Sequence, residues 1–155
     1  MTPAIIQARK AKIVYSIHEY QHSPSCSSYG SEAAEKLGLP EDRVFKTLVV
    51  RLDDDRLVVA VVPVKSLLNM KLIARAAKAK KAAMADKDAV VKATGYVLGG
   101  VSPLGQKRKL LTFIDSSAAG FPTIYVSAGR RGLDMELRSE DLVDLTDGCY
   151  TDLCR

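Results

Sequence analysis

Two runs of β-branched and aliphatic residues place the strongest constraint on how this 155-residue chain folds. The first run covers residues 44–50 (VFKTLVV), and the second covers residues 57–62 (LVVAVV). A short polar connection that contains Asp53, Asp54 and Asp55 separates them. Runs of this composition and length are typical of buried strands, so the pattern predicts a hairpin at the centre of a sheet.

Lys46 is a charged residue inside the first of these runs. An ammonium group that is buried without compensation is costly enough that it usually loses its proton instead. We therefore expect Lys46 to meet an anionic partner, to point into a cleft or to lie at the end of its strand. Lys46 is the first candidate for a functional residue.

The rest of the chain predicts one α/β domain over residues 1–155, with a mixed or antiparallel sheet. Capping residues and apolar periodicity predict helices over 3–12 with Thr2 as cap, 32–38 after Ser31, 70–78 after Asn69, 85–93, and 139–145 with Ser139 as cap. Further strands are expected over 13–20, 110–114, 123–127 and 135–138.

Composition indicates a protein of the cytoplasm. Hydrophobic residues make up 47% of the chain and charged residues 26%, which is the profile of a globular protein. The sequence has no apolar stretch of the roughly 18 residues that span a bilayer, and its first residues lack the pattern of a signal peptide. We expect the three cysteines, Cys26, Cys149 and Cys154, to be reduced thiols.

The net charge of +5 is unevenly distributed. Basic residues gather without acids over 65–81, at 107–109 and at 130–131. Such clusters are often only a solvated face, but three of them also favour a polyanionic partner such as RNA. No RNA-binding module signature accompanies them, so both interpretations stay open at this point.

Residues 95–105 (GYVLGGVSPLG) form a glycine-rich segment that we expect to be a loop. It lacks the Gly-Lys-Ser/Thr ending of a phosphate-binding P-loop and the helix that follows a dinucleotide fingerprint. It is either a tight turn or a main-chain cradle for a carbonyl or phosphate. Residues 125–132 (YVSAGRRG) are expected to be a second loop, suited to phosphate or sugar contacts or simply solvated.

Nucleophile triads and metal sites find little support in the sequence. The only histidines are His18 and His22, and no serine lies in a Gly-x-Ser-x-Gly elbow. A metal site of His18, His22 and Cys26 would combine a strand with a loop, where a spacing of four has no helical meaning. We therefore expect neither a bound metal nor a cofactor.

Taken together, these segments resemble the YbaK family of aminoacyl-tRNA editing proteins. The matching segments run nearly from end to end, in the expected order, over residues 1–4, 32–38, 45–48, 84–87, 94–96, 99–107 and 124–127. The resemblance implies a single α/β domain with a mixed, mainly antiparallel, partly barrel-like sheet flanked by helices. It further implies a free-standing deacylase that removes cysteine from mischarged Cys-tRNA(Pro), with prolyl-tRNA synthetase as a second candidate partner.

The resemblance also implies the residues of the site. Lys46 matches the essential lysine of the family, and residues 99–103 match its Gly-x-x-x-Pro loop. The implied catalytic residues are Lys46, Gly99 and Gly100, the two glycines offering main-chain amides to the developing oxyanion. The implied substrate-binding residues are Tyr20, Thr47, Val101, Ser102, Pro103, Ser127 and Asp134, of which Asp134 varies most among relatives.

The implied mechanism is substrate-assisted, because the thiol of the substrate cysteine attacks its own ester carbonyl and leaves as a thiolactone. Two other functions stay open. One is a deacylase for another misacylated tRNA, such as one charged with alanine. The other is a module that binds tRNA or a synthetase without catalysis.

Overall fold

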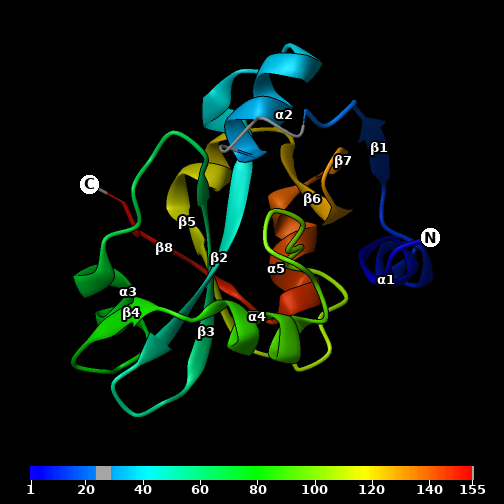
Figure 1. Ribbon diagram of the computed structural model, residues 1–155. Coiled ribbons are helices and arrows are strands. Elements are labelled where there is room, and N and C mark those ends of the chain that lie inside the picture. The colour runs from blue at the N-terminus through cyan, green and yellow to red at the C-terminus, as the bar shows by residue number, and fades with distance from the viewer. Residues whose placement is uncertain (24–28, 155) are drawn as a thin grey trace.

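The computed structural model describes residues 1–23 and 29–154 (Figure 1). The α-helices are α1 (Pro3–Ala11), α2 (Tyr29–Leu37), α3 (Met70–Ala76), α4 (Lys87–Thr94) and α5 (Ser139–Thr146), and 3₁₀ helices cover η1 (Glu41–Arg43) and η2 (Ser116–Gly120). The strands are β1 (Tyr15–Glu19), β2 (Phe45–Leu52), β3 (Leu57–Pro63), β4 (Ala82–Met84), β5 (Leu111–Asp115), β6 (Ile124–Arg130), β7 (Leu133–Leu137) and β8 (Cys149–Thr151).

The strands form two sheets. The smaller has the order β1-β7-β6 and is antiparallel throughout. The larger has the order β4-β2-β3-β5-β8, in which β2 pairs antiparallel with β3 and β4, while β3–β5 and β5–β8 are parallel. An isolated parallel bridge between Val44 and Tyr125 links the two sheets. The predicted mixed, mainly antiparallel α/β fold is confirmed, although the sheets do not close into a barrel.

The predicted central hairpin is β2–β3, in which Lys46 lies opposite Val62. Its turn is closed by a hydrogen bond from the Leu52 amide to the Arg56 carbonyl, and Asp55 takes up a left-handed conformation with φ of 69°. β3 is buried along nearly all of its length, because β2 and the parallel strand β5 cover its edges and side chains pack on both of its faces.

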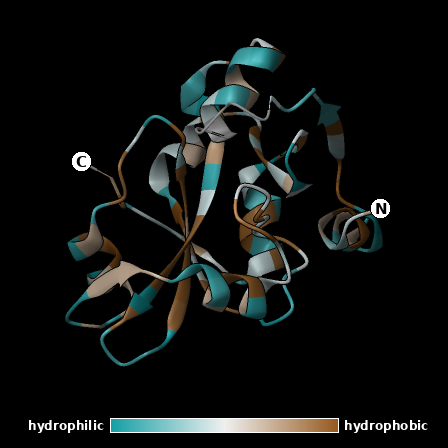
Figure 2. Ribbon diagram, viewed as in Figure 1, coloured by the Kyte–Doolittle hydropathy of each residue, from teal (hydrophilic) through white to brown (hydrophobic). Residues whose placement is uncertain are grey.

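The core lies in two layers on either side of the larger sheet. Val59 and Val61 of β3 pack between the sheets against residues such as Met135 of β7. Val58 and Val62 point the other way, toward a second cluster beneath α3. Figure 2 shows the brown, hydrophobic strands at the centre of the molecule and teal residues on the outer turns and helices.

α2 covers the start of β2 beside β6, where Ala33 packs against Tyr125 and Val44 (Figure 1). Glu32 holds this helix in place, because its carboxylate lies 2.7 Å from His22 Nδ1 and accepts a hydrogen bond from the Ser23 amide. Burial opposes ionisation of Glu32, but these bonds and Lys36 outweigh it and lower its pKa to about 2.

Helix caps were partly predictable. Thr2, Asn69 and Asp86 each accept a hydrogen bond from a backbone amide in the first turn of the helix that follows, and the first two confirm the prediction. The predicted start of α2 and the predicted cap of α5 are wrong. α2 begins at Tyr29 rather than after Ser31. Ser139 is already the first residue of α5, where its hydroxyl lies 2.7 Å from Tyr150 Oη.

One further prediction needs correction, and two strands were missed. Residues 125–130 are not a loop, because β6 continues to Arg130 through an irregularity in its pairing with β7. Strands β4 and β8 were not expected at all. The part of the chain that the structure describes contains no helix both long and apolar enough to cross a membrane.

Candidate functional site

A cavity of about 90 Å³ lies where the start of β2 meets α2, the glycine-rich segment and the hairpin of β6 and β7. Its walls come from elements far apart in the sequence, and the Val44–Tyr125 bridge between the two sheets lies next to it. The residues that line the cavity are Tyr20, Ala33, Val44, Phe45, Lys46, Thr47, Gly99, Val101, Ser127, Arg130 and Asp134.

The cavity gathers most of the residues that the sequence nominates. The nominated residues in its lining are Tyr20, Lys46, Thr47, Gly99, Val101, Ser127 and Asp134. Gly100, Ser102 and Pro103 are not part of this lining, although they belong to the same glycine-rich segment as Gly99. The structure therefore brings seven of the ten nominated residues together.

Lys46 is the second residue of β2 and is half-buried. Its Nζ donates a hydrogen bond of 3.4 Å to the Val64 carbonyl, and among the described residues no carboxylate comes within ion-pair distance of it. Burial lowers the pKa of Lys46. The ammonium thus lies at a strand end and lines a cleft, as expected, and it keeps the capacity to bind an anion.

Thr47 carries a hydroxyl whose hydrogen-bonding capacity is unused. Its Oγ1 is buried and has no hydrogen-bond partner among the described residues. No other buried side-chain nitrogen or oxygen of these residues lacks a partner. An unsatisfied buried polar group costs about 1–3 kcal/mol. A ligand with a polar atom at this position would recover that free energy, which makes Thr47 a candidate binding residue on physical grounds.

Asp134 contributes a buried carboxyl from the second residue of β7, opposite Ser127 on β6 and His18 on β1. Only 6% of the residue is exposed. Burial raises the pKa of Asp134 to about 7, and His18 partly opposes that shift. Near neutral pH the carboxyl can therefore both give and accept a proton.

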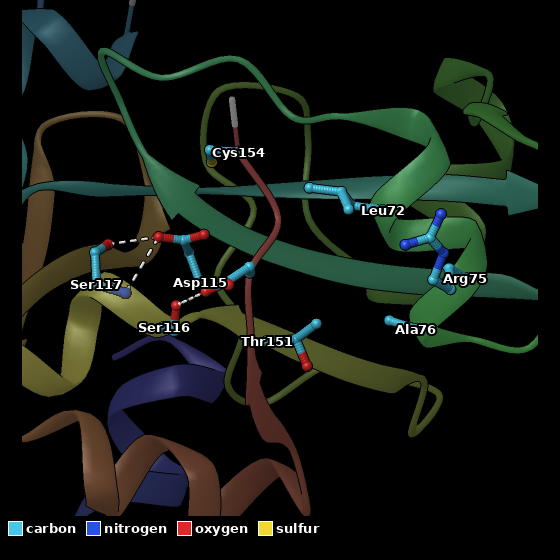
Figure 3. A pocket seen from close by; sticks show the side chains of 9 residues that line it. Leu72, Arg75, Ala76, Asp115, Ser116, Ser117, Thr151 and Cys154 are labelled. Atoms are coloured by element: carbon cyan, nitrogen blue, oxygen red, sulfur yellow. Dashed lines mark hydrogen bonds between the residues drawn. The ribbon is translucent and has the colours of Figure 1, made fainter.

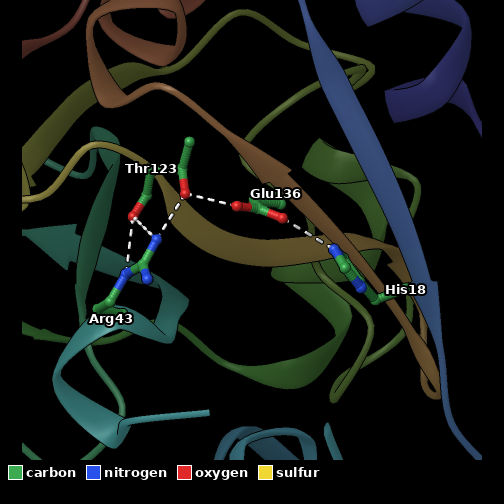
Figure 4. A network of polar contacts seen from close by, with 4 residues as sticks. All are labelled: His18, Arg43, Thr123 and Glu136. Atoms are coloured by element: carbon green, nitrogen blue, oxygen red, sulfur yellow. Dashed lines mark hydrogen bonds and ion pairs between the residues drawn. The ribbon is translucent and has the colours of Figure 1, made fainter.

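A polar network fixes the wall behind the cavity (Figure 4). Glu136 lies 3.0 Å from His18 Nε2 and accepts a hydrogen bond of 2.6 Å from the Thr123 hydroxyl. That hydroxyl in turn accepts one from Arg43, whose guanidinium also lies 5.3 Å from the centre of the Tyr125 ring. The network ties η1 to β1, to β7 and to the residue that precedes β6, and the Arg43 guanidinium packs on Tyr125 beside α2.

Gly100 lies in a turn, which differs from its expected role of offering its main-chain amide to the oxyanion. Its amide donates a hydrogen bond of 3.0 Å to the Val97 carbonyl, and Gly99 has a φ of 88°, as in a type II turn. A Cβ on Gly100 would lie 2.9 Å from the Cα of Arg130. Gly100 therefore allows the glycine-rich segment to pack against β6, and its amide is already engaged within the turn.

Ser102 and Pro103 are also absent from the lining of this cavity. Ser102 is fully buried, its Oγ accepts a hydrogen bond from the Leu104 amide, and its carbonyl accepts one from Gln106. Pro103 lines a separate cavity of about 500 Å³ against α1 and α5. These residues are absent from the lining around Lys46, and their assignment as substrate-binding residues stays a prediction.

A cavity of about 670 Å³, larger than the two already described, lies beside α3 and the C-terminal segment, and none of the nominated residues lines it (Figure 3). Its buried carboxylate, Asp115, accepts hydrogen bonds from Ser117 and from the Leu153 amide, so it serves to fix the C-terminal segment. Burial raises the pKa of Cys154 to about 11, which keeps the thiol protonated and unsuited to act as a nucleophile.

Among the described residues, each histidine lies within ion-pair distance of a carboxylate: His18 pairs with Glu136, and His22 pairs with Glu32. Cys26, the third residue considered for a metal site, lies outside the described residues. Arg130 also lines the cavity, although the sequence indicated it only as part of a basic cluster and of the 125–132 segment suited to phosphate or sugar contacts, not as a residue of the site around Lys46. Val44 and Ala33 gave no signal, since each looks like an ordinary core residue.

Comparison with known proteins gives a consistent result. A family model described as the aminoacyl-tRNA editing domain matches residues 23–145. The chain is 36% identical over 152 residues to the Enterococcus faecalis protein named "Putative Cys-tRNA(Pro)/Cys-tRNA(Cys) deacylase EbsC", with 98% of this chain and 92% of that protein covered. It is 27% identical over 125 residues to the uncharacterized protein YwhH of Bacillus subtilis, with 80% and 79% covered.

Among solved structures, one described as a "putative trans-editing enzyme for prolyl tRNA synthetase" superposes with a TM-score of 0.82. The match covers 100% of this chain and 99% of the other, at 21% sequence identity. At this level of identity the likeness establishes the fold alone.

Proposed function

Because this chain belongs to the aminoacyl-tRNA editing domain family, we propose that it acts in trans as a deacylase that removes cysteine from mischarged Cys-tRNA(Pro). The observation that carries this proposal is the small cavity that combines Lys46, the unpartnered Thr47 hydroxyl and the buried Asp134 carboxyl. Its volume is only about 90 Å³. That space suits the side chain of a small amino acid.

Such an enzyme has a physical reason to exist. A synthetase pocket separates side chains of similar size by only about 1–3 kcal/mol, which is too little for accurate translation. Cysteine and proline are comparable in volume, so charging of tRNA(Pro) with cysteine is an expected error. The substrate would be a mischarged tRNA in the cytoplasm, with prolyl-tRNA synthetase as the partner that releases it.

We assign the reaction to the substrate's own thiol. The thiol sulfur attacks the ester carbonyl, the ester C–O bond breaks, the thiol proton passes to the ribose oxygen, and the amino acid leaves as a thiolactone that later hydrolyses. Asp134 suits the proton transfer, because its raised pKa of about 7 is close to that of a thiol, about 8.5. This mechanism needs neither a protein nucleophile nor a metal.

Lys46 and Gly99 are the residues we assign to the developing oxyanion. Both line the cavity, and the Gly99 amide forms no hydrogen bond within the described part of the chain. Losing one such donor typically costs about 2.7–4 kcal/mol of barrier. The Gly100 amide is assigned no such role, since it is bound to Val97. Thr47 would bond a polar atom of the bound aminoacyl group.

A panel of charged tRNAs tests the substrate. Purified protein is incubated with tRNA(Pro) that carries cysteine, alanine or proline, and the remaining ester is measured over time. We expect rapid loss of cysteine and preservation of proline. Faster loss of alanine would point to an alanine-editing enzyme instead, and binding of tRNA without any deacylation would point to a non-catalytic module.

The thiol mechanism has its own test. Serine in place of the substrate cysteine keeps the shape of the side chain but replaces the thiol with a much weaker nucleophile, and we expect deacylation to nearly stop. Equal turnover of the two substrates would mean that an activated water attacks the ester.

A further inference from the structure

The cavity around Lys46 is too small to hold a nucleotide. Its volume of about 90 Å³ falls well below the roughly 300–1,000 Å³ of typical ligand pockets. If the aminoacyl group enters it, the 3′-terminal nucleotide must lie against the rim. The rim is formed by the turn of the glycine-rich segment and the β6–β7 hairpin, with Val97, Leu98, Arg130 and Arg131 as its exposed residues.

These two loops are joined into one surface. The Arg131 guanidinium donates a hydrogen bond of 2.9 Å to the Leu98 carbonyl, and the Val97 carbonyl closes the turn onto Gly100. Gly100 itself packs against the backbone of Arg130, where no larger residue would fit. The rim is thus pre-formed, and a ligand would not need to order it.

The rim carries two kinds of group that can contact a nucleotide, namely exposed apolar side chains and an arginine. Val97 and Leu98 are 61% and 41% exposed, which places two adjacent apolar side chains in solvent beside the site. The exposed Arg130 also lines the cavity, and it forms no ion pair with a carboxylate of the described residues. A planar guanidinium is well matched to a phosphate, and apolar side chains suit the face of a base.

We propose that this rim, made of Val97, Leu98, Arg130 and Arg131, is the subsite for the 3′-terminal nucleotide of the substrate. Arg130 binds the 5′-phosphate of that nucleotide, next to the mouth of the cavity, and Val97 and Leu98 pack against its base. Arg131 positions the turn through Leu98. The inference rests on the proposed deacylase function and adds a specific contact surface to it.

Three small substrates isolate these contacts. They are 3′-O-cysteinyl-AMP, which carries the nucleotide and its phosphate, 3′-O-cysteinyl-adenosine, which lacks the phosphate, and cysteine ethyl ester, which lacks the nucleotide. For the unmodified protein we expect kcat/KM to fall about tenfold with loss of the phosphate, as for one charge-assisted hydrogen bond, and again with loss of the adenosine.

Arg130→Ala should abolish the preference for cysteinyl-AMP over cysteinyl-adenosine, whereas Arg130→Lys should retain part of it. The matched control is Arg9→Ala, an exposed arginine at the far end of α1 from Thr2, which should leave the preference unchanged. A preference that survives Arg130→Ala, or that the unmodified protein lacks, would overturn the phosphate assignment.

The base contact is tested by the double change Val97→Ser and Leu98→Ser, which should reduce the preference for cysteinyl-adenosine over the ethyl ester several-fold. Leu67→Ser is its control, because Leu67 is 77% exposed but lies outside the rim. An unchanged preference would refute the base contact. A protein inactive on every substrate, Cys-tRNA(Pro) included, would instead overturn the deacylase function, and the subsite with it.

Discussion

Thr47 is the residue at which fold stability and proposed function conflict most clearly. Its buried hydroxyl has no partner among the described residues, so Thr47→Val removes an unsatisfied group while keeping the shape of the side chain. We expect the free energy of unfolding to rise by about 1 kcal/mol and deacylation of Cys-tRNA(Pro) to fall. Urea unfolding and a deacylation assay on the same preparation measure both.

Thr112→Val is the matched control, since the buried Thr112 hydroxyl donates to the Leu110 carbonyl. Its loss should lower stability by about 1 kcal/mol. A loss of stability as large as that of Thr112→Val would show that the Thr47 hydroxyl is bonded within the fold, and intact deacylation would show that it has no role in binding.

Asp134 should make stability depend on pH. Its pKa is raised from 3.8 to about 7 in the folded state, so the fold favours the protonated form. The stability that this carboxyl contributes is complete below pH 3.8 and is lost as the pH rises through 7. Asp134→Asn should therefore gain stability relative to the original protein over this range, levelling off at up to about 4 kcal/mol.

Urea unfolding at several pH values measures this difference, and groups common to both proteins cancel from it. A difference that stays flat between pH 4 and pH 8 would show that the carboxyl is ionised in the fold as freely as in the unfolded chain.

Single site residues were predictable only where the local sequence was unusual or where the family resemblance indicated them. Lys46 stood out because a charge interrupts an apolar run, and Thr47, Gly99 and Asp134 followed from the family resemblance. Arg130 could not be placed, because its position in the lining depends on the glycine-rich segment, about 30 residues earlier in the chain. The burial of Ser102 depends on contacts of the same long-range kind.

At the scale of elements, the glycine-rich loop depends on its contact with β6. A Cβ on Gly100 would lie 2.9 Å from the Arg130 Cα, which is backbone and cannot easily move. Gly100→Ala should therefore lower the free energy of unfolding by about 1–3 kcal/mol and reduce deacylation as the loop shifts. Thermal or urea unfolding and the activity assay report the two effects.

Gly120→Ala provides the control, since a Cβ there would meet nothing within 4 Å and the backbone needs no glycine-specific conformation. We expect its stability to change by less than about 0.5 kcal/mol. Equal effects of the two substitutions would mean that the loop and β6 are not tightly packed in solution.

Elements with strong local signals were predicted well, and short edge strands were not. The β2–β3 hairpin follows from its β-branched runs, and Thr2 and Asn69 cap their helices as expected. β4 and β8 have only three residues each and lie at the two edges of the larger sheet. Their formation depends on the backbone of β2 and β5 beside them, which leaves little trace in their own sequence.

For the whole molecule, the sequence predicted an α/β class but could not specify how the two sheets meet. The parallel pairing of Val58 with Leu111 and the bridge from Val44 to Tyr125 join segments more than 50 residues apart. These long-range pairings create the cavity, because they bring the start of β2 to the outer face of β6 and β7. The family resemblance implied one mixed, partly barrel-like sheet, and it did not specify two sheets joined in this way.

The central claim is that this junction of two sheets is a deacylation site in which Lys46 acts on the ester. The most direct measurement is the rate at which Lys46→Ala releases cysteine from Cys-tRNA(Pro), with the circular dichroism spectrum as a check on the fold. Lys92→Ala, an exposed lysine of α4, is the matched control. We expect the Lys46→Ala variant to stay folded and to lose about 100-fold or more in rate, whereas Lys92→Ala should stay active. Full activity of a folded Lys46→Ala variant would contradict the claim.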